Sequence, residues 1–127
     1  MTRTAVALGL LLASTATVGA VETLKRTATP GAFLRVARHH DIDETGCIPR
    51  DPPSLVVTAQ PKKGSTLIGL ELTTIPDGKC RGTMVDTRVL LYMAEDANGG
   101  DDRFEYEVGH SPLRVEKFAV QVRIPKR

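Results

Sequence analysis

The frequent Pro and Gly residues are the feature of this sequence that most restricts its fold. Beyond residue 20, one or the other recurs every few positions along the 127-residue chain. Proline has no amide hydrogen to donate within a helix, and glycine is entropically costly inside a helix or a strand. Long helices therefore have no room, and the pattern predicts short strands joined by turns.

Alternation of apolar and charged side chains locates the strands. In the stretch GDDRFEYEV, residues 100–108, Phe104, Tyr106 and Val108 alternate with charged residues. This is the period of a strand with one buried face and one solvated face. The segment KFAVQVRI at residues 117–124 alternates in the same way. Further strands are predicted at residues 55–60, 65–72 and 88–94, with a turn at residues 76–78.

The segment TPGAFLRVARHH at residues 29–40 fits two structures. Thr29-Pro30 is typical of a helix start, whereas Pro30-Gly31 is equally typical of a turn that leads into a strand. We favour a first strand at residues 33–37. With the others, it predicts an all-β, antiparallel sandwich of about seven short strands, whose two sheets bury their apolar faces against each other.

The first twenty residues, MTRTAVALGLLLASTATVGA, predict a secretory signal peptide. One cation, Arg3, is followed by an apolar run at residues 5–13 and by small residues that end at Ala20. We expect cleavage after Ala20 and a single domain at residues 21–127. The apolar run is much shorter than the roughly 20 residues of a spanning helix, so no membrane insertion is expected after cleavage. The protein is expected to be exported, either to the periplasm or out of the cell.

Charge is nearly balanced in the expected mature chain. Cleavage removes one cation, Arg3, from 17 Lys and Arg that stand against 15 Asp and Glu. The remaining basic residues are scattered among acidic ones, so neither nucleic acid nor an anionic membrane surface is favoured as a partner.

Cys47 and Cys80 are the two cysteines of the chain. In an oxidising compartment such a pair is expected to form a disulfide. The bond would close a loop of roughly 34 residues, which corresponds to about 3–4 kcal/mol in the chain-entropy model. A redox or metal-binding pair is the alternative, but the two residues are not in a Cys-x-x-Cys arrangement.

A series of five alternate residues, Gly100, Asp102, Phe104, Tyr106 and Val108, has the form Gly-x-Asp-x-Phe-x-Tyr-x-Val. This signature, with the upstream turn AQPKKG, resembles that of small exported bacterial immunoglobulin-like, cadherin-like domains. The resemblance covers residues 47–124, although Ala94 stands where the family often has Pro. It implies an Ig-like sandwich used for adhesion, spacing or protein contacts, with no catalytic residues and no cofactor. From the residues themselves, Asp102 is expected to bond backbone amides in a turn.

Two polar segments could hold a metal ion. The segment RHHDIDE has the ligand types of a transition-metal site at His39, His40, Asp41, Asp43 and Glu44. If it is extended, adjacent histidines point to opposite sides, and His39 shares a side with Asp41 and Asp43. The segment EDANGGDD has the oxygen ligands that calcium prefers, at Glu95, Asp96, Asn98, Asp101 and Asp102. Solvated loop charges are the commoner interpretation of both segments.

Residues for catalysis are few. The serines after residue 20 are Ser54, Ser65 and Ser111, with His110 beside the last, and no Gly-x-Ser-x-Gly turn is present. The paired carboxylates Glu105 and Glu107 fall on the expected solvated face of a strand. We therefore expect no enzymatic activity.

These observations favour an exported, non-catalytic Ig-like binding or structural module that makes protein contacts in the bacterial envelope. Its partner would be an unidentified protein or envelope component, contacted through sheet edges or loops. The alternatives are a periplasmic metal-binding protein that uses His39–Glu44 and a small secreted inhibitor that presents the disulfide-tied loop. The sequence does not set the oligomeric state.

Overall fold

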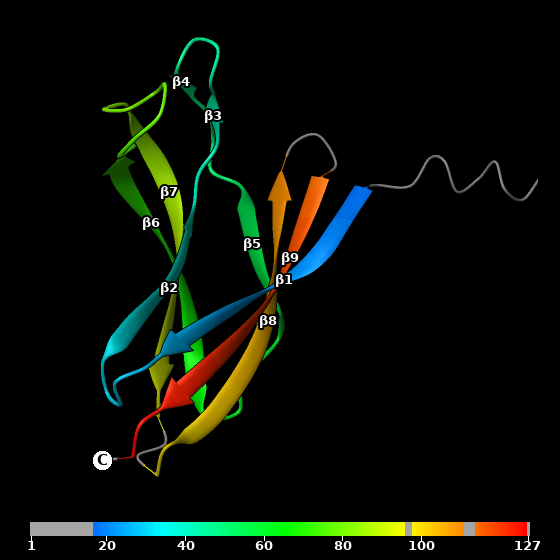
Figure 1. Cartoon of the computed structure of the whole chain (residues 1–127), viewed down its shortest axis with the longest axis vertical. Coiled ribbons are helices and arrows are strands. Elements are labelled where there is room, and N and C mark those ends of the chain that lie inside the picture. The colour runs from blue at the N-terminus through cyan, green and yellow to red at the C-terminus, as the bar shows by residue number, and fades with distance from the viewer. Residues whose placement is uncertain (1–16, 96–97, 111–113, 127) are drawn as a thin grey trace, which may run out of the picture.

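The computed structural model describes residues 17–95, 98–110 and 114–126, with side chains from Ala20 onward. These residues form an all-β structure without a helix (Figure 1). The strands are β1 (Thr17–Thr27), β2 (Phe33–His39), β3 (Ile42–Asp43), β4 (Ile48–Pro49), β5 (Ser54–Ala59), β6 (Gly64–Thr74), β7 (Met84–Ala94), β8 (Gly100–His110) and β9 (Arg114–Ile124). The predicted signal peptide lies largely outside the described residues, and β1 begins before the expected cleavage point at Ala20.

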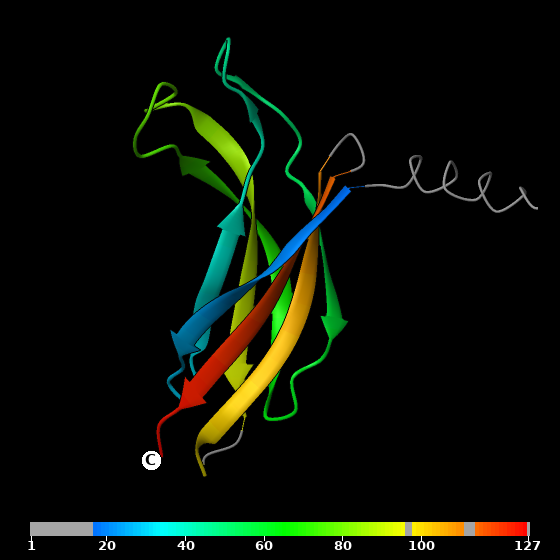
Figure 2. The ribbon, with the colours of Figure 1, turned by 45° about the vertical axis from the view of Figure 1, so that its right-hand side comes forward.

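The strands form two main sheets and one small hairpin. One sheet has four strands in the order β1-β9-β8-β5, and the other has three strands in the order β2-β7-β6. Strands β3 and β4 pair with each other alone among the described strands. The two main sheets face each other, as the views in Figures 1 and 2 show.

The prediction of an antiparallel arrangement is wrong at one sheet edge. Strand β1 pairs with β9 in parallel, with Leu24 opposite Val120 and Thr27 opposite Arg123. The next strand, β2, lies in the other sheet, so the partner of β1 is the last strand of the chain and not its neighbour in sequence. The described residues form nine strands rather than the predicted seven or so, and five of these strands are 11 residues long.

The predicted strands occur where alternation placed them, and most extend further. Along β9, Phe118, Val120, Val122 and Ile124 are buried while Gln121 and Arg123 are exposed. The ambiguous segment at residues 33–37 is a strand, as favoured. A shift in the β2–β7 register between Arg35 and Ala37 places Val36 in the core.

Both main sheets contribute to a single hydrophobic core. From the three-stranded sheet come Val36, Leu90, Tyr92 and Ala94; from the four-stranded sheet come Leu55, Phe104, Tyr106, Val108, Phe118, Val120, Val122 and Ile124. Aromatic rings stack within this core. The ring centroids of Tyr92 and Phe104 are 5.8 Å apart, and those of Tyr106 and Phe118 are 4.9 Å apart. Such offset pairs add stability beyond the area that they bury.

The predicted disulfide between Cys47 and Cys80 is present, with 5.3 Å between the two Cα atoms. It joins the β3–β4 hairpin to the loop between β6 and β7. Cys47 has a φ of 52°, in the left-handed region that a residue with a side chain seldom adopts. The crosslink therefore fixes two loops that have little regular pairing of their own.

Candidate functional site

The transition-metal candidates in RHHDIDE are not brought together. His39 points between the sheets, where its Nε2 lies 2.9 Å from the Tyr106 hydroxyl, whereas His40 is exposed. Asp43 accepts a hydrogen bond from the Thr45 amide and lies 3.8 Å from Arg50. Across the described residues, no group of three or more His, Cys, Asp or Glu side chains could hold a metal ion.

His39 instead packs against the core. Its ring packs on Phe118 with centroids 5.3 Å apart and meets Tyr106 edge-on. Burial lowers the pKa of His39, and the positive charges of His110 and His40 lower it further, against the opposing effect of Glu116. A neutral imidazole that bonds a buried hydroxyl is a structural arrangement.

The calcium candidates are dispersed as well. Glu95 and Asp101 are exposed, and Asp96 lies outside the described residues. Asp102, by contrast, points into the protein and is only 7% exposed. The first residue of the segment EDANGGDD therefore faces solvent, whereas the last is buried in the protein.

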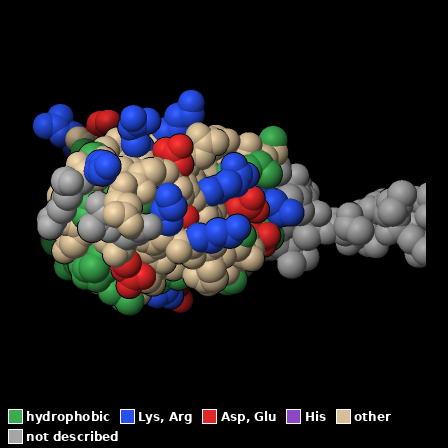
Figure 3. All heavy atoms as spheres, turned by 90° about the horizontal axis from the view of Figure 1, so that it is seen from below, with side chains coloured by type: hydrophobic (Ala, Val, Ile, Leu, Met, Phe, Trp, Pro, Cys, Tyr) green, Lys and Arg blue, Asp and Glu red, His purple; other side chains and the backbone are tan. Residues whose placement is uncertain are grey.

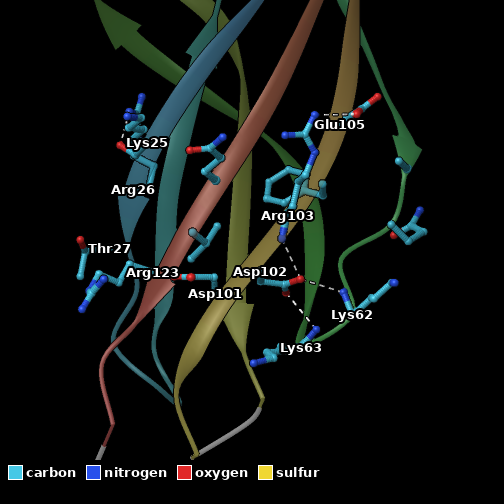
Figure 4. A pocket seen from close by; sticks show the side chains of 15 residues that line it. Lys25, Arg26, Thr27, Lys62, Lys63, Asp101, Asp102, Arg103, Glu105 and Arg123 are labelled. Atoms are coloured by element: carbon cyan, nitrogen blue, oxygen red, sulfur yellow. Dashed lines mark hydrogen bonds and ion pairs between the residues drawn. The ribbon is translucent and has the colours of Figure 1, made fainter.

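The carboxylate of Asp102 organises the turn between β5 and β6. It accepts hydrogen bonds from the amides of Lys62 and Lys63 at 2.9 Å each, and from the amide of Arg103 at 2.8 Å (Figure 4). The Tyr92 hydroxyl donates a further bond at 2.7 Å. This confirms the expectation that Asp102 bonds backbone amides in a turn. Burial raises the pKa of Asp102, but these four donors outweigh burial and hold the pKa below its ordinary value.

The other signature residues have packing roles. Phe104, Tyr106 and Val108 are fully buried. Gly100 has a φ of 109°, which glycine adopts without a steric penalty. In the turn that Asp102 holds, a Cβ at Gly64 would collide with the Met93 carbonyl oxygen and the Tyr92 ring. The signature is thus accounted for by the core and by one turn, without a ligand.

A groove of about 830 Å³ lies over the four-stranded sheet beside this turn (Figure 4). Its lining carries both signs of charge, including Lys25, Lys62, Arg123 and Asp101. Lys and Arg side chains, with Asp and Glu among them, gather on the lower end of the molecule (Figure 3). Glu105 in the groove is paired with Arg103 at 3.1 Å, and the one aromatic side chain in the lining, Phe104, is buried. The groove therefore lacks an exposed ring on which a base or a sugar could stack.

The remaining catalytic candidates do not form a constellation. Ser54 and Ser65 are exposed on β5 and β6, and Ser111 lies outside the described residues. His110 is bonded to Glu116, with 2.7 Å between Nε2 and Oε1. Glu105 and Glu107 are half-buried on β8 and face away from the core residue between them, Tyr106.

Strand β6 presents an exposed apolar surface that motif analysis did not single out. Its Leu67, Ile68, Leu70 and Leu72 are 53%, 37%, 56% and 60% exposed. Ile68, Leu70 and Leu72 share one face of the strand, and Leu67 lies on the other. We call these four residues the β6 strip. Met84 of β7, 53% exposed, lies on the same face as Leu70 because it pairs with Thr74.

The edge of β6 is also open. Among the described strands it pairs with β7 alone, over 11 residues and without a register shift. Within β6 there is no Pro, Lys or Arg. Its one charged side chain, Glu71, is held by Arg35 through two hydrogen bonds of 2.9 and 2.8 Å.

The other three edges of the two main sheets carry features that keep strands from pairing with other chains. Each of β1, β2 and β5 has a register shift in its pairing. Strand β1 carries Lys25 and Arg26, β2 carries Arg35 and Arg38, and β5 is short and follows Pro52-Pro53. Charges, bulges, short length and nearby proline all discourage strand addition. Strand β6 is the exception among the four edges of the two main sheets.

No helix in the described part of the chain is long and apolar enough to cross a membrane. Comparisons of the chain with protein-family models, with curated proteins and with solved structures found no match.

Proposed function

We propose that the chain is an exported, non-catalytic module with an Ig-like β-sandwich fold, and that it binds a protein by strand addition at the edge of β6. One observation carries the proposal: β6 is an 11-residue edge strand that pairs without a register shift, has exposed apolar side chains and has none of the protective features of the other main-sheet edges. A partner strand would satisfy its free backbone groups and cover the β6 strip.

The rest of the molecule supports a scaffold role. Both sheets share one core, the signature residues are used in packing and in a turn, and the disulfide ties two loops. A disulfide in a small β domain is compatible with export. Among the described residues, the polar candidates for chemistry either bond structural partners, as His39 and Asp102 do, or lie apart on the surface. An adhesive or spacing function needs only a rigid domain and a contact surface. The edge of β6 could serve as that contact surface.

A capture experiment with envelope extract of the source cells tests this proposal. The tagged protein is compared with two variants, Leu70→Lys on β6 and Val56→Lys on β5. The two side chains are matched, since each is 56% exposed and lies on an edge strand. Lysine at an edge opposes strand addition.

We expect the parent protein and Val56→Lys to recover the same protein in stoichiometric amount, and Leu70→Lys to lose it. Circular dichroism must show that all three proteins are folded. If Leu70→Lys retains the partner, or if the folded parent protein binds neither another protein nor a second copy of its own chain, the β6 edge is not a binding surface.

A further inference from the structure

We infer that the strand added to β6 is the β6 strand of a second copy of the chain. Two copies would pair antiparallel about a two-fold axis at Leu70 and join their three-stranded sheets into one sheet of six strands. This inference rests on the proposed function, because it names the partner of the same edge. A two-fold contact of this kind closes on itself, since each copy uses the same surface.

The β6 strip is complementary to itself in one register. When Leu70 lies opposite Leu70 of the second copy, Leu72 lies opposite Ile68 of that copy, and Ile68 opposite its Leu72. Every exposed apolar side chain on that face then meets another apolar side chain, the kind of cross-strand pair that stabilises sheets. The pairing runs over residues 66–74, which β6 holds in extended conformation.

Neighbouring registers are poorer. A two-fold axis at Gly69 would place Leu72 opposite Thr66 and Leu67 opposite Glu71. An axis at Glu71 would bring two carboxylates directly opposite each other, which is destabilising. The register at Leu70 avoids both and sets each Glu71 opposite Gly69 of the other copy.

Gly69 gives a second, independent reason for this register. A Cβ at Gly69 would meet no atom within 4 Å, and its φ is not in the left-handed region, so nothing in the described part of the chain requires glycine there. Opposite Glu71 of the second copy, a missing side chain leaves room for the Glu71 carboxylate and its Arg35 partner. Glycine in a strand commonly marks a place where another backbone comes close.

Charge does not oppose the association. The formal net charge of the chain is only +2 at pH 7, so two copies repel each other weakly. The charged side chain within β6 is already neutralised by Arg35 in its own chain. A strongly charged partner would make few favourable contacts with this apolar strip. A second copy of the chain provides an apolar side chain opposite each one on that face.

Sedimentation velocity at high micromolar concentration tests the association, with Leu70→Lys and Val56→Lys as matched variants. We expect the parent protein and Val56→Lys to sediment as a species of twice the mass of one chain. Leu70→Lys should sediment as a single chain, because it places two ammonium groups opposite each other at the axis. A folded parent protein that sediments as a single chain would overturn the inference.

Cysteine crosslinking tests the register and does not depend on the lysine variant. Residues directly opposite in an antiparallel pair have Cα atoms about 4.5–5.5 Å apart, within reach of a disulfide. Leu70→Cys is therefore expected to form a covalent dimer on mild oxidation. Leu67→Cys, with similar exposure, should not, because the two copies of residue 67 would be about 20 Å apart along the strands.

Equal crosslinking of the two cysteine variants would refute the register at Leu70. The two proposals fail in different ways. A single-chain parent protein whose capture of another envelope protein still depends on Leu70 would end the inference and leave the proposed function standing. If Leu70→Lys behaved like the parent protein both in capture and in sedimentation, the inference and the proposed function would both be wrong.

Discussion

At the scale of single residues, Asp102 shows how a buried carboxylate can serve structure alone. An ionised group in a dry site is costly unless hydrogen bonds compensate it. Asp102 has four donors, three of them backbone amides from two segments about 40 positions apart in the chain. It therefore fixes the turn between β5 and β6 against the start of β8, and so sets where β6 begins.

Replacement of Asp102 by Asn is predicted to destabilise the fold by about 2–4 kcal/mol at neutral pH, because charge-assisted bonds are lost and one amide donor then faces other donors. Chemical denaturation measures the change. The matched control is Asp101→Asn, since Asp101 is exposed and adjacent. A cost for Asp102→Asn no larger than that of the control would contradict this role.

The contribution of Asp102 to the free energy of unfolding is also predicted to depend on pH. The folded-state pKa of Asp102 is below the ordinary value of about 3.9, so its contribution is complete above that pH and is lost as pH falls through the folded pKa. The stability difference between the parent protein and Asp102→Asn should therefore narrow in acid. A difference that stays constant from neutral pH to below pH 4 would be inconsistent with an ionised Asp102.

At the scale of elements, alternation in the sequence predicts strands well where one face is buried. Strands β8 and β9 follow this rule and were located correctly. Strand β1 was missed because it lies at a sheet edge, where Val21 is 58% exposed and Leu24 is half-buried, so its alternation is weak. Its parallel pairing with β9 depends on a crossing between sheets that no local pattern records.

The β6 strip carries no polar motif, so its residues predict a strand but not a site. The strand was predicted, yet Leu67 and Ile68 are adjacent, so apolar side chains fall on both faces. Among the described residues, the motifs of polar ligands and nucleophiles lie in parts of the fold that do not meet in one site. The absence of Lys, Arg and Pro from residues 64–74 was visible in the sequence. Its meaning depended on knowing that β6 is an edge.

The disulfide acts at the scale of elements, because it joins the short β3–β4 hairpin to the loop after β6. Replacing both Cys47 and Cys80 by Ser should lower the free energy of unfolding by about 3–4 kcal/mol, since the sequence separation is 33 residues. Thermal unfolding measures the loss. The fully buried residues of the core are elsewhere, so the variant should keep its sheet signal in circular dichroism at low temperature. A melting temperature unchanged by the double replacement would show that the loops need no crosslink.

At the scale of the whole molecule, the two sheets depend on one core. Tyr92 belongs to the three-stranded sheet and Tyr106 to the four-stranded sheet, and both side chains are fully buried. The chain has no other tyrosine and no tryptophan. The two phenols therefore report on both sheets without interference. Because the core is shared, we expect the sheets to unfold together.

Alkaline titration tests whether the two sheets unfold together. Burial raises the pKa of Tyr92, and the hydrogen bond and charge of Asp102 raise it further. Burial also raises the pKa of Tyr106, with smaller opposing and reinforcing effects from Arg26 and from Glu22 and Glu116. A raised folded-state pKa gives stability that is complete below the unfolded value of about 10 and is lost as pH rises above it.

Neither phenol should ionise while the protein is folded. Tyrosinate absorbance is therefore expected to appear above pH 10 in one step, together with the loss of the far-ultraviolet signal. The variant Tyr92→Phe should show a step of half the height that still coincides with unfolding. It reports on Tyr106 alone, and so on the four-stranded sheet. Two separate absorbance steps, or ionisation near pH 10 with the dichroism unchanged, would mean that the sheets open independently and that the core is not the common support of both.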